Sequence, residues 1–159
     1  MDNNYISILI ESLEKKVKVL DAIHDENALQ SDILDAEKFD DEAFDATIDR
    51  KEELIRQLTL LDSGFEKIYG RVREVLTEQK DLHKDQIRKL QALIVQVTER
   101  GTRIEAEEAR NSQKLQQRLA TERRQVRTTR KNAQVVNSYY SSMGSAQGQA
   151  PSRFLDSKN

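Results

Sequence analysis

The chain has 159 residues, of which 36% are hydrophobic and 34% charged; soluble domains average about 45–50% apolar residues, counting Gly, and about 25% charged residues. The length is too short for two sizeable cores, and the composition predicts a narrow buried stripe rather than a thick α/β domain. With 5 Gly and 1 Pro, chain reversals are scarce, which disfavours strand-rich folds. The absence of Cys excludes disulfides, thiolate metal sites and a cysteine nucleophile.

The formal net charge of −2 hides two opposed blocks. Residues 21–53 contain thirteen acids against three bases, and residues 110–131 contain eight bases against one acid. We expect the basic block to pack loosely near the acidic one, at about 1 kcal/mol or less, because exposed pairs are screened.

The first predicted helix covers residues 4–30, because apolar residues recur there at steps of three and four. This seam consists of Ile6, Leu9, Leu13, Val17, Leu20 and Ile23. Acids accumulate after it, and the sequence predicts a solvated connection that leads to a second helix.

The second predicted helix covers residues 40–76. Asp40 or Asp41 is suited to accept the free amides at its start, and Phe39 is placed to pack on Phe44 as a hydrophobic staple. Its apolar residues follow a repeat close to seven, interrupted but not ended by Gly64 and Gly70. The seam is Ile48, Leu54 or Ile55, Leu58, Leu61, Phe65, Ile68, Val72, Val75 and Leu82.

The third predicted helix covers residues 85–139, after a turn near residues 77–85 where the apolar phase slips. Its stripe is dense from Ile87 to Ile104 and sparse beyond, so its second half is predicted to overhang the bundle. Residues 141–159 are predicted to be a flexible tail. The predicted fold is therefore all-α: an elongated antiparallel bundle, or coiled coil, of about three long helices over residues 1–140.

Reactive chemistry finds few candidates. His24 and His83 have no second His at a metal-binding spacing, and both are predicted to be solvated surface residues. Gly64 and Gly70 do not form a phosphate loop, and the acids at 32–45 lack the spacing of a calcium loop. We expect no catalytic residue, no metal and no cofactor. With no apolar run of 18 residues and no basic-then-apolar start, we expect a cytoplasmic protein without membrane insertion.

The basic block at 110–131 leaves three interpretations open. Bases along a helix can neutralise phosphates, but no aromatic residue is interleaved, so nucleic acid is the least favoured partner. The other two are a solvated face and docking of a protein partner or of the acidic block.

The segment after it is weakly apolar and ends in two adjacent tyrosines, Tyr139 and Tyr140. Such a segment has too little apolar surface to fold alone but enough to dock on a larger protein. Alternatively, Val135, Val136 and Tyr139 complete the bundle seam.

Four segments together resemble a known family. They are KEELIRQL at 51–58, LDSGFEKIYGRV at 61–72, NAQVVNSYY at 132–140 and PSRFLDSK at 151–158. With the chain length and the acidic connection, they make the sequence similar to FlgN-type flagellar export chaperones, in particular the Firmicutes-like members. The resemblance spans nearly the whole chain.

The resemblance implies a cytoplasmic chaperone that binds hook-associated, or hook-filament junction, proteins, keeps them unassembled and delivers them to the membrane protein of the flagellar export gate. It implies no reaction and no small-molecule substrate. Cargo would be bound by the last helical segment, and Tyr139 or Tyr140 would dock to the gate. The cargo candidates are Leu115, Leu119, Val126, Asn132, Val135, Val136 and Asn137. The competing hypotheses are a self-associating structural coiled coil and a nucleic-acid-binding helical protein.

Overall fold

The computed structural model describes residues 2–78 and 80–122. This part contains three helices and no strand: α1 (Asp2–Asp35), α2 (Asp41–Glu78) and α3 (Lys84–Glu122). The all-α prediction is therefore confirmed for the described residues. The predicted continuation of the third helix to residue 139 and the predicted tail at 141–159 lie outside them.

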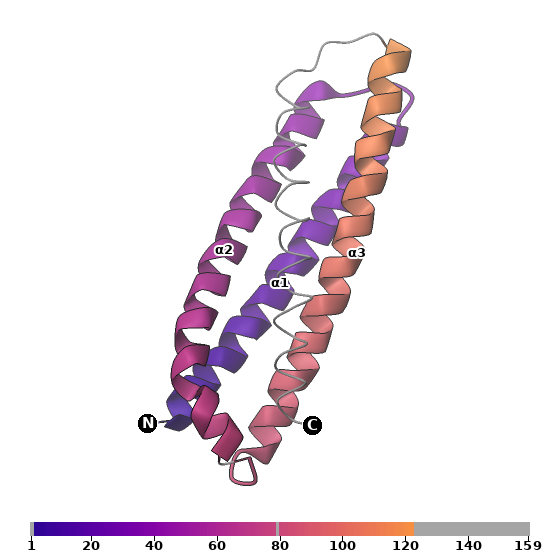
Figure 1. Ribbon diagram of the computed structural model, residues 1–159. Coiled ribbons are helices and arrows are strands. Elements are labelled where there is room, and N and C mark those ends of the chain that lie inside the picture. The colour runs from indigo at the N-terminus through magenta and orange to yellow at the C-terminus, as the bar shows by residue number, and fades with distance from the viewer. Residues whose placement is uncertain (1, 79, 123–159) are drawn as a thin grey trace.

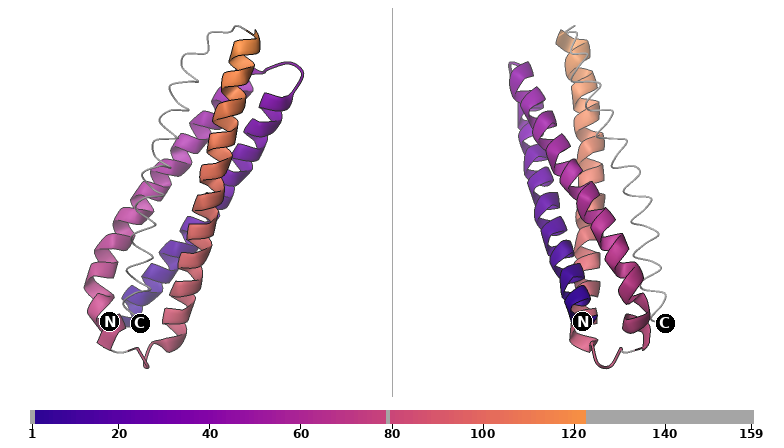
Figure 2. Two further views of the ribbon diagram at one scale, coloured as in Figure 1. Left: turned by 45° about the vertical axis from the view of Figure 1, so that its right-hand side comes forward. Right: turned by 90° about the vertical axis from the view of Figure 1, so that its left-hand side faces the viewer.

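The three helices form an elongated bundle (Figure 1). α1 runs from one end to the other, α2 returns, and α3 repeats the direction of α1. We call the end with the start of α1 and the α2–α3 turn the proximal end, and the end with the α1–α2 connection and Glu122 the distal end. α1 packs along both other helices, whereas α2 and α3 approach each other much less closely (Figure 2).

The main core fills the space between the helices over most of their length. Its α1 members include five of the six predicted seam residues, with Val17 partly buried at the margin, and also Ile10, which the spacing did not predict. Fully or almost fully buried side chains of the three helices include Ile6, Leu9, Leu20, Ile23, Leu58, Val72, Leu90 and Ile104. α2 continues through Gly64 and Gly70, as predicted, and a methyl group added to either glycine would meet no atom within 4 Å.

Three details differ from the sequence predictions. α1 continues to Asp35 rather than ending near residue 30, because Leu34 is buried one turn beyond the polar Gln30, which is itself buried. Leu82 does not extend the seam of α2: it lies in the α2–α3 turn, 75% exposed. His83 is not solvated but 6% exposed, with its Nδ1 3.1 Å from Gln86 Oε1.

Candidate functional site

The predicted partner-binding residues divide into two groups. Leu115 and Leu119 belong to the last turns of α3, where they are 3% and 2% exposed. The others lie outside the described residues: Val126, Asn132, Val135, Val136, Asn137, Tyr139 and Tyr140. Leu115 and Leu119 therefore do not overhang the bundle, as the sparse stripe predicted, but are buried in it.

These two leucines close a second apolar cluster at the distal end, which we call the distal cluster. It contains Leu34 of α1, Phe39 of the connection, Phe44 and Ile48 of α2, and Leu115 and Leu119 of α3. Sequence spacing alone could not reveal it, because the side chains that cover Leu115 and Leu119 come from residues about 70–80 positions earlier.

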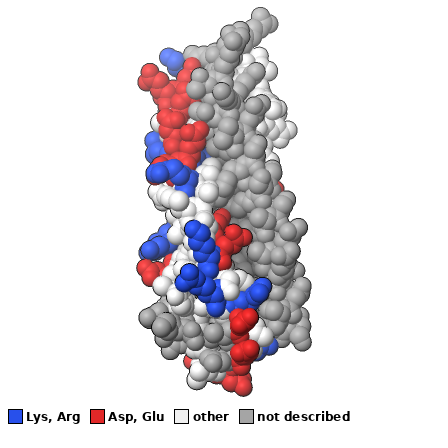
Figure 3. Space-filling view, turned by 60° about the vertical axis from the view of Figure 1, so that its left-hand side comes forward, with Lys and Arg blue, Asp and Glu red and all other residues white. Residues whose placement is uncertain are grey.

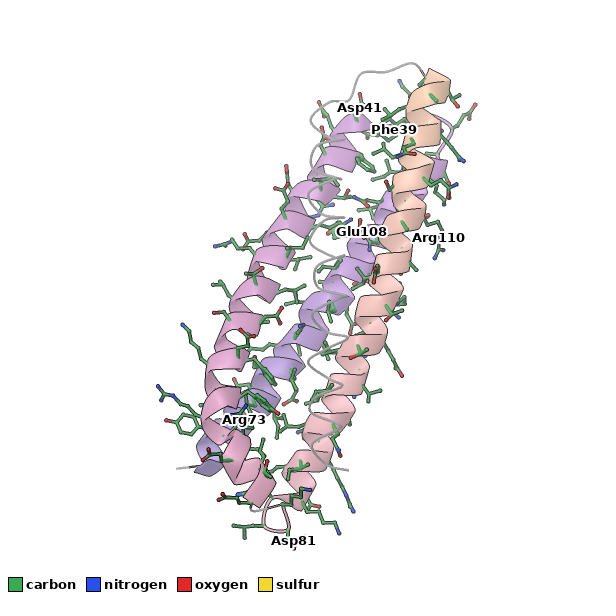
Figure 4. The ribbon with its side chains drawn as sticks, viewed as in Figure 1. Phe39, Asp41, Arg73, Asp81, Glu108 and Arg110 are labelled. Atoms are coloured by element: carbon green, nitrogen blue, oxygen red, sulfur yellow. The ribbon has the colours of Figure 1, made fainter. Side chains whose placement is uncertain are left out.

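Local signals in the sequence explain how the connection is held over this cluster. Asp40 caps α2, since its Oδ1 accepts a hydrogen bond from Ala43 N at 3.0 Å. The rings of Phe39 and Phe44 pack with their centroids 5.7 Å apart, so the predicted staple is confirmed. Phe39 is only 2% exposed and lies at the distal end in Figure 4.

Two cations of α3 bind the end of α1 and the connection that follows it. Arg118 donates to the carbonyl oxygens of Ala36 and Glu37 at 2.6 Å each, and its guanidinium lies 5.9 Å from the centroid of the Phe39 ring. Lys114 Nζ lies 2.9 Å from Asp35 Oδ2. The predicted packing of the basic block near the acidic one is confirmed for these two residues, which are therefore already engaged within the bundle.

A layer of buried polar side chains separates the distal cluster from the main core. Its centre is an ion pair between Lys51 of α2 and Glu108 of α3, 0% and 6% exposed. Glu108 lies on the side of α3 that faces α2 (Figure 4). Gln30 Oε1 of α1 accepts from Lys51 Nζ at 3.1 Å and from Asn111 Nδ2 at 3.3 Å. All three helices therefore meet in this layer.

Burial governs the titration of the pair. Loss of hydration lowers the pKa of Lys51 below its ordinary value, and the neighbouring carboxylates only partly offset this. Loss of hydration likewise raises the pKa of Glu108, against the opposing effect of the Lys51 ammonium. This pair is not predictable from the sequence, because in a chain with 34% charged residues a charged side chain at a seam position resembles the many surface charges.

A second polar group, formed by three residues, continues the layer toward the surface of the α1–α3 interface. Asn27 Nδ2 donates to Glu107 Oε1 at 3.2 Å, and His24 Nδ1 contacts Glu107 Oε2. His24 therefore has a specific partner rather than water alone. Within the described ranges, no three His, Cys, Asp or Glu side chains gather in a way that could hold a metal ion.

A small hollow opens between α2 and α3 beside the polar layer. It is lined by Gln30, Phe44, Ile48, Glu108, Asn111, Ser112 and Leu115. Gln30 is 1% exposed, and its Nε2 has no hydrogen-bond partner within residues 2–78 and 80–122. A buried donor without a partner costs about 1–3 kcal/mol, so a polar group or water entering the hollow would be stabilised there.

Comparisons place no known protein beside this arrangement: no family model, curated protein or solved structure matches the chain. None of the helices in the described part is both long and apolar enough to cross a bilayer. The functional conclusion therefore depends on the sequence resemblance and on the geometry of the bundle.

Proposed function

We propose that this protein is a FlgN-type flagellar export chaperone. It binds a hook-filament junction protein in the cytoplasm, prevents its premature assembly and delivers it to the export gate, without catalysing a reaction. The sequence resemblance at 51–72, 132–140 and 151–158 supports the family. In this proposal the three-helix bundle is the scaffold, and the segment that follows α3 recognises the cargo.

One structural observation supports our proposal that the cargo-binding site lies beyond Glu122. Leu115 and Leu119 are enclosed by Phe39, Phe44 and Leu34 in the distal cluster, so the bundle itself uses them. The apolar candidates left for a partner are Val126, Val135 and Val136, with Asn132 and Asn137 as polar neighbours. Such a segment can cover an amphipathic helix of the cargo and release it again, because binding is coupled to ordering.

Truncation after Glu122 tests this assignment. The shortened chain retains every residue of the distal cluster, so its helical circular dichroism and cooperative unfolding should persist. Calorimetry against purified hook-junction proteins should show binding by the full chain and none by the truncated chain. Unchanged affinity after truncation would refute the location of the site, and no affinity of the full chain for any hook-junction protein would refute the function.

The two tyrosines are assigned a separate task, docking to the export gate. Replacing Tyr139 and Tyr140 by Ala should impair filament formation while cargo affinity is retained, because a large ring with a hydroxyl is an effective docking anchor. The single Tyr139→Ala and Tyr140→Ala variants show which of the two is required. Normal secretion by the double variant would contradict this role.

A further inference from the structure

α2 and α3 each pack extensively on α1 but make little contact with each other. We call the surface between α2 and α3 around the small hollow described above the groove. The hollow lined by Phe44 and Ile48 of α2 and by Ser112 and Leu115 of α3 lies in the distal part of this groove. The buried Nε2 of Gln30, which has no partner among the described residues, borders it. The groove therefore has both apolar walls and an unused donor.

The α2 wall of the groove is acidic. Arg50 pairs with Glu26 of α1 at 2.8 Å, so it lies on the side of α2 that faces α1. Ile48 lines the hollow and so lies on the groove side of α2. Next to Ile48, Asp45 and Glu52 follow each other at a seven-residue step and so share one face of the helix. Acidic side chains form a column over the distal half of the face seen in Figure 3.

The acids of this wall disfavour one another. Partial burial raises the pKa of Asp45, and the carboxylates of Asp41 and Asp49 raise it further. Residues 41–53 hold six acids against Arg50 and Lys51, and Lys51 is directed into the core toward Glu108. A cationic segment along this wall would thus relieve like-charge repulsion.

The chain supplies such a segment at the right end of the bundle. α3 ends at Glu122, at the distal end where α2 begins. Residues 123–131 then hold five bases and no acid. The 18 residues at 123–140 would span about 27 Å as a helix, which equals the reach of the first half of α2. Its apolar residues Val126, Val135 and Val136 match the partly buried Ile55 and the lining of the hollow.

We propose that residues 123–140 bind back into the groove between α2 and α3 of the same molecule. The basic part at 123–131 lies along the acidic wall of α2, and the apolar residues of the segment cover the groove toward Ile55. This interaction concerns one chain alone and does not depend on the proposed function.

Spin-label distances test the proposal on the full chain, which contains no natural Cys that would react. One label is placed at Ser138→Cys and the other at Thr59→Cys, which follows Glu52 by seven residues on the groove side. The matched control pairs Ser138→Cys with Gln57→Cys, which lies on the opposite side of α2. Thr59 and Gln57 are both exposed. Docking predicts a narrow distribution of label-to-label distances for the Thr59 pair. Its mean should be shorter than that of the Gln57 pair by about 10 Å, which is one helix diameter.

Charge reversal supplies the second arm of the test. The triple variant Arg123→Glu, Arg124→Glu and Arg127→Glu should broaden the Thr59 distribution, and adding Asp45→Lys and Glu52→Lys should narrow it again. Arg110→Glu is the control, because Arg110 is exposed on the outer side of α3 (Figure 4). Circular dichroism checks that the bundle stays folded in every variant.

Three results would overturn the proposal. The first is a broad distribution that is the same for Thr59 and Gln57. The second is a short distance that disappears when labelled protein is diluted with unlabelled protein, since the groove would then hold a second copy of the chain. The third is a narrow distribution that the triple reversal leaves unchanged.

Discussion

Breaking the buried ion pair from either side should produce opposite pH dependences. In Lys51→Met, the Glu108 carboxyl stays buried without its cation, and the folded protein will take up a proton. Protonating the Glu108 carboxylate at pH 7, from an ordinary pKa of 4.5, costs about 3.4 kcal/mol, whereas at pH 5 it costs only about 0.7 kcal/mol. Because the raised pKa favours the protonated folded state, this variant should regain stability as the pH falls from 7 to 5.

Glu108→Gln should behave in the reverse sense. It leaves the Lys51 ammonium with Gln30 Oε1 as an acceptor at 3.1 Å. Deprotonating the Lys51 ammonium at pH 7, from an ordinary pKa of 10.5, costs about 4.8 kcal/mol, whereas at pH 9 it costs about 2 kcal/mol. The lowered pKa favours the neutral folded form, so stability should recover as the pH rises. Both penalties agree with the about 3–5 kcal/mol typical of a broken buried pair.

Urea unfolding followed by circular dichroism at pH 5, 7 and 9 measures these differences as shifts of the midpoint. The double variant Lys51→Met with Glu108→Met is the control, because a buried pair replaced by apolar residues is often neutral or stabilising by about 1–4 kcal/mol. At pH 7 the free energy of unfolding of the double variant should therefore equal or exceed that of the natural chain. The reasoning is refuted if both single variants lie within 1 kcal/mol of the natural chain, or if neither responds to pH.

Four further variants test other parts of the fold by the same unfolding assay. Phe39→Ala should cost about 3–5 kcal/mol, with faster hydrogen exchange confined to the distal end, and uniform exchange along the helices would contradict a separate distal cluster. Gly64→Ala and Gly70→Ala should each stabilise by about 0.5–1 kcal/mol, since a methyl group meets nothing there; destabilisation would mean that the glycines serve a contact. Leu82→Gln should change stability by less than about 0.5 kcal/mol, because its side chain is 75% exposed; a larger loss would place Leu82 in a core.

Local patterns predicted much of this fold, and long-range contacts account for what they missed. The seam of α1, the Asp40 cap and the Phe39–Phe44 contact all depend on residues within a few turns of one another, so spacing suffices to predict them. The end of α1 was misplaced because polar Asn27 and Gln30 occupy buried seam positions.

The candidate site was predictable only in part for the same reason. Sparse leucines near the end of α3 suggest an overhang when they are considered alone. Leu115 is buried because Phe44, far back in the sequence, lies in the same cluster. Similarly, the residues next to Lys51 in the sequence do not predict that it pairs with Glu108, which lies more than fifty residues later.

The position of the Lys51–Glu108 pair also affects the axial register of the helices, that is, how far each is shifted along the others. Apolar seams alone would tolerate a slide of α3 by two turns, since one leucine substitutes well for another. After such a slide Glu108 would lie beside Phe44 or Leu58, each seven residues from Lys51, and both charges would be buried without a partner. The single buried ion pair therefore favours one register of the three helices over the shifted ones.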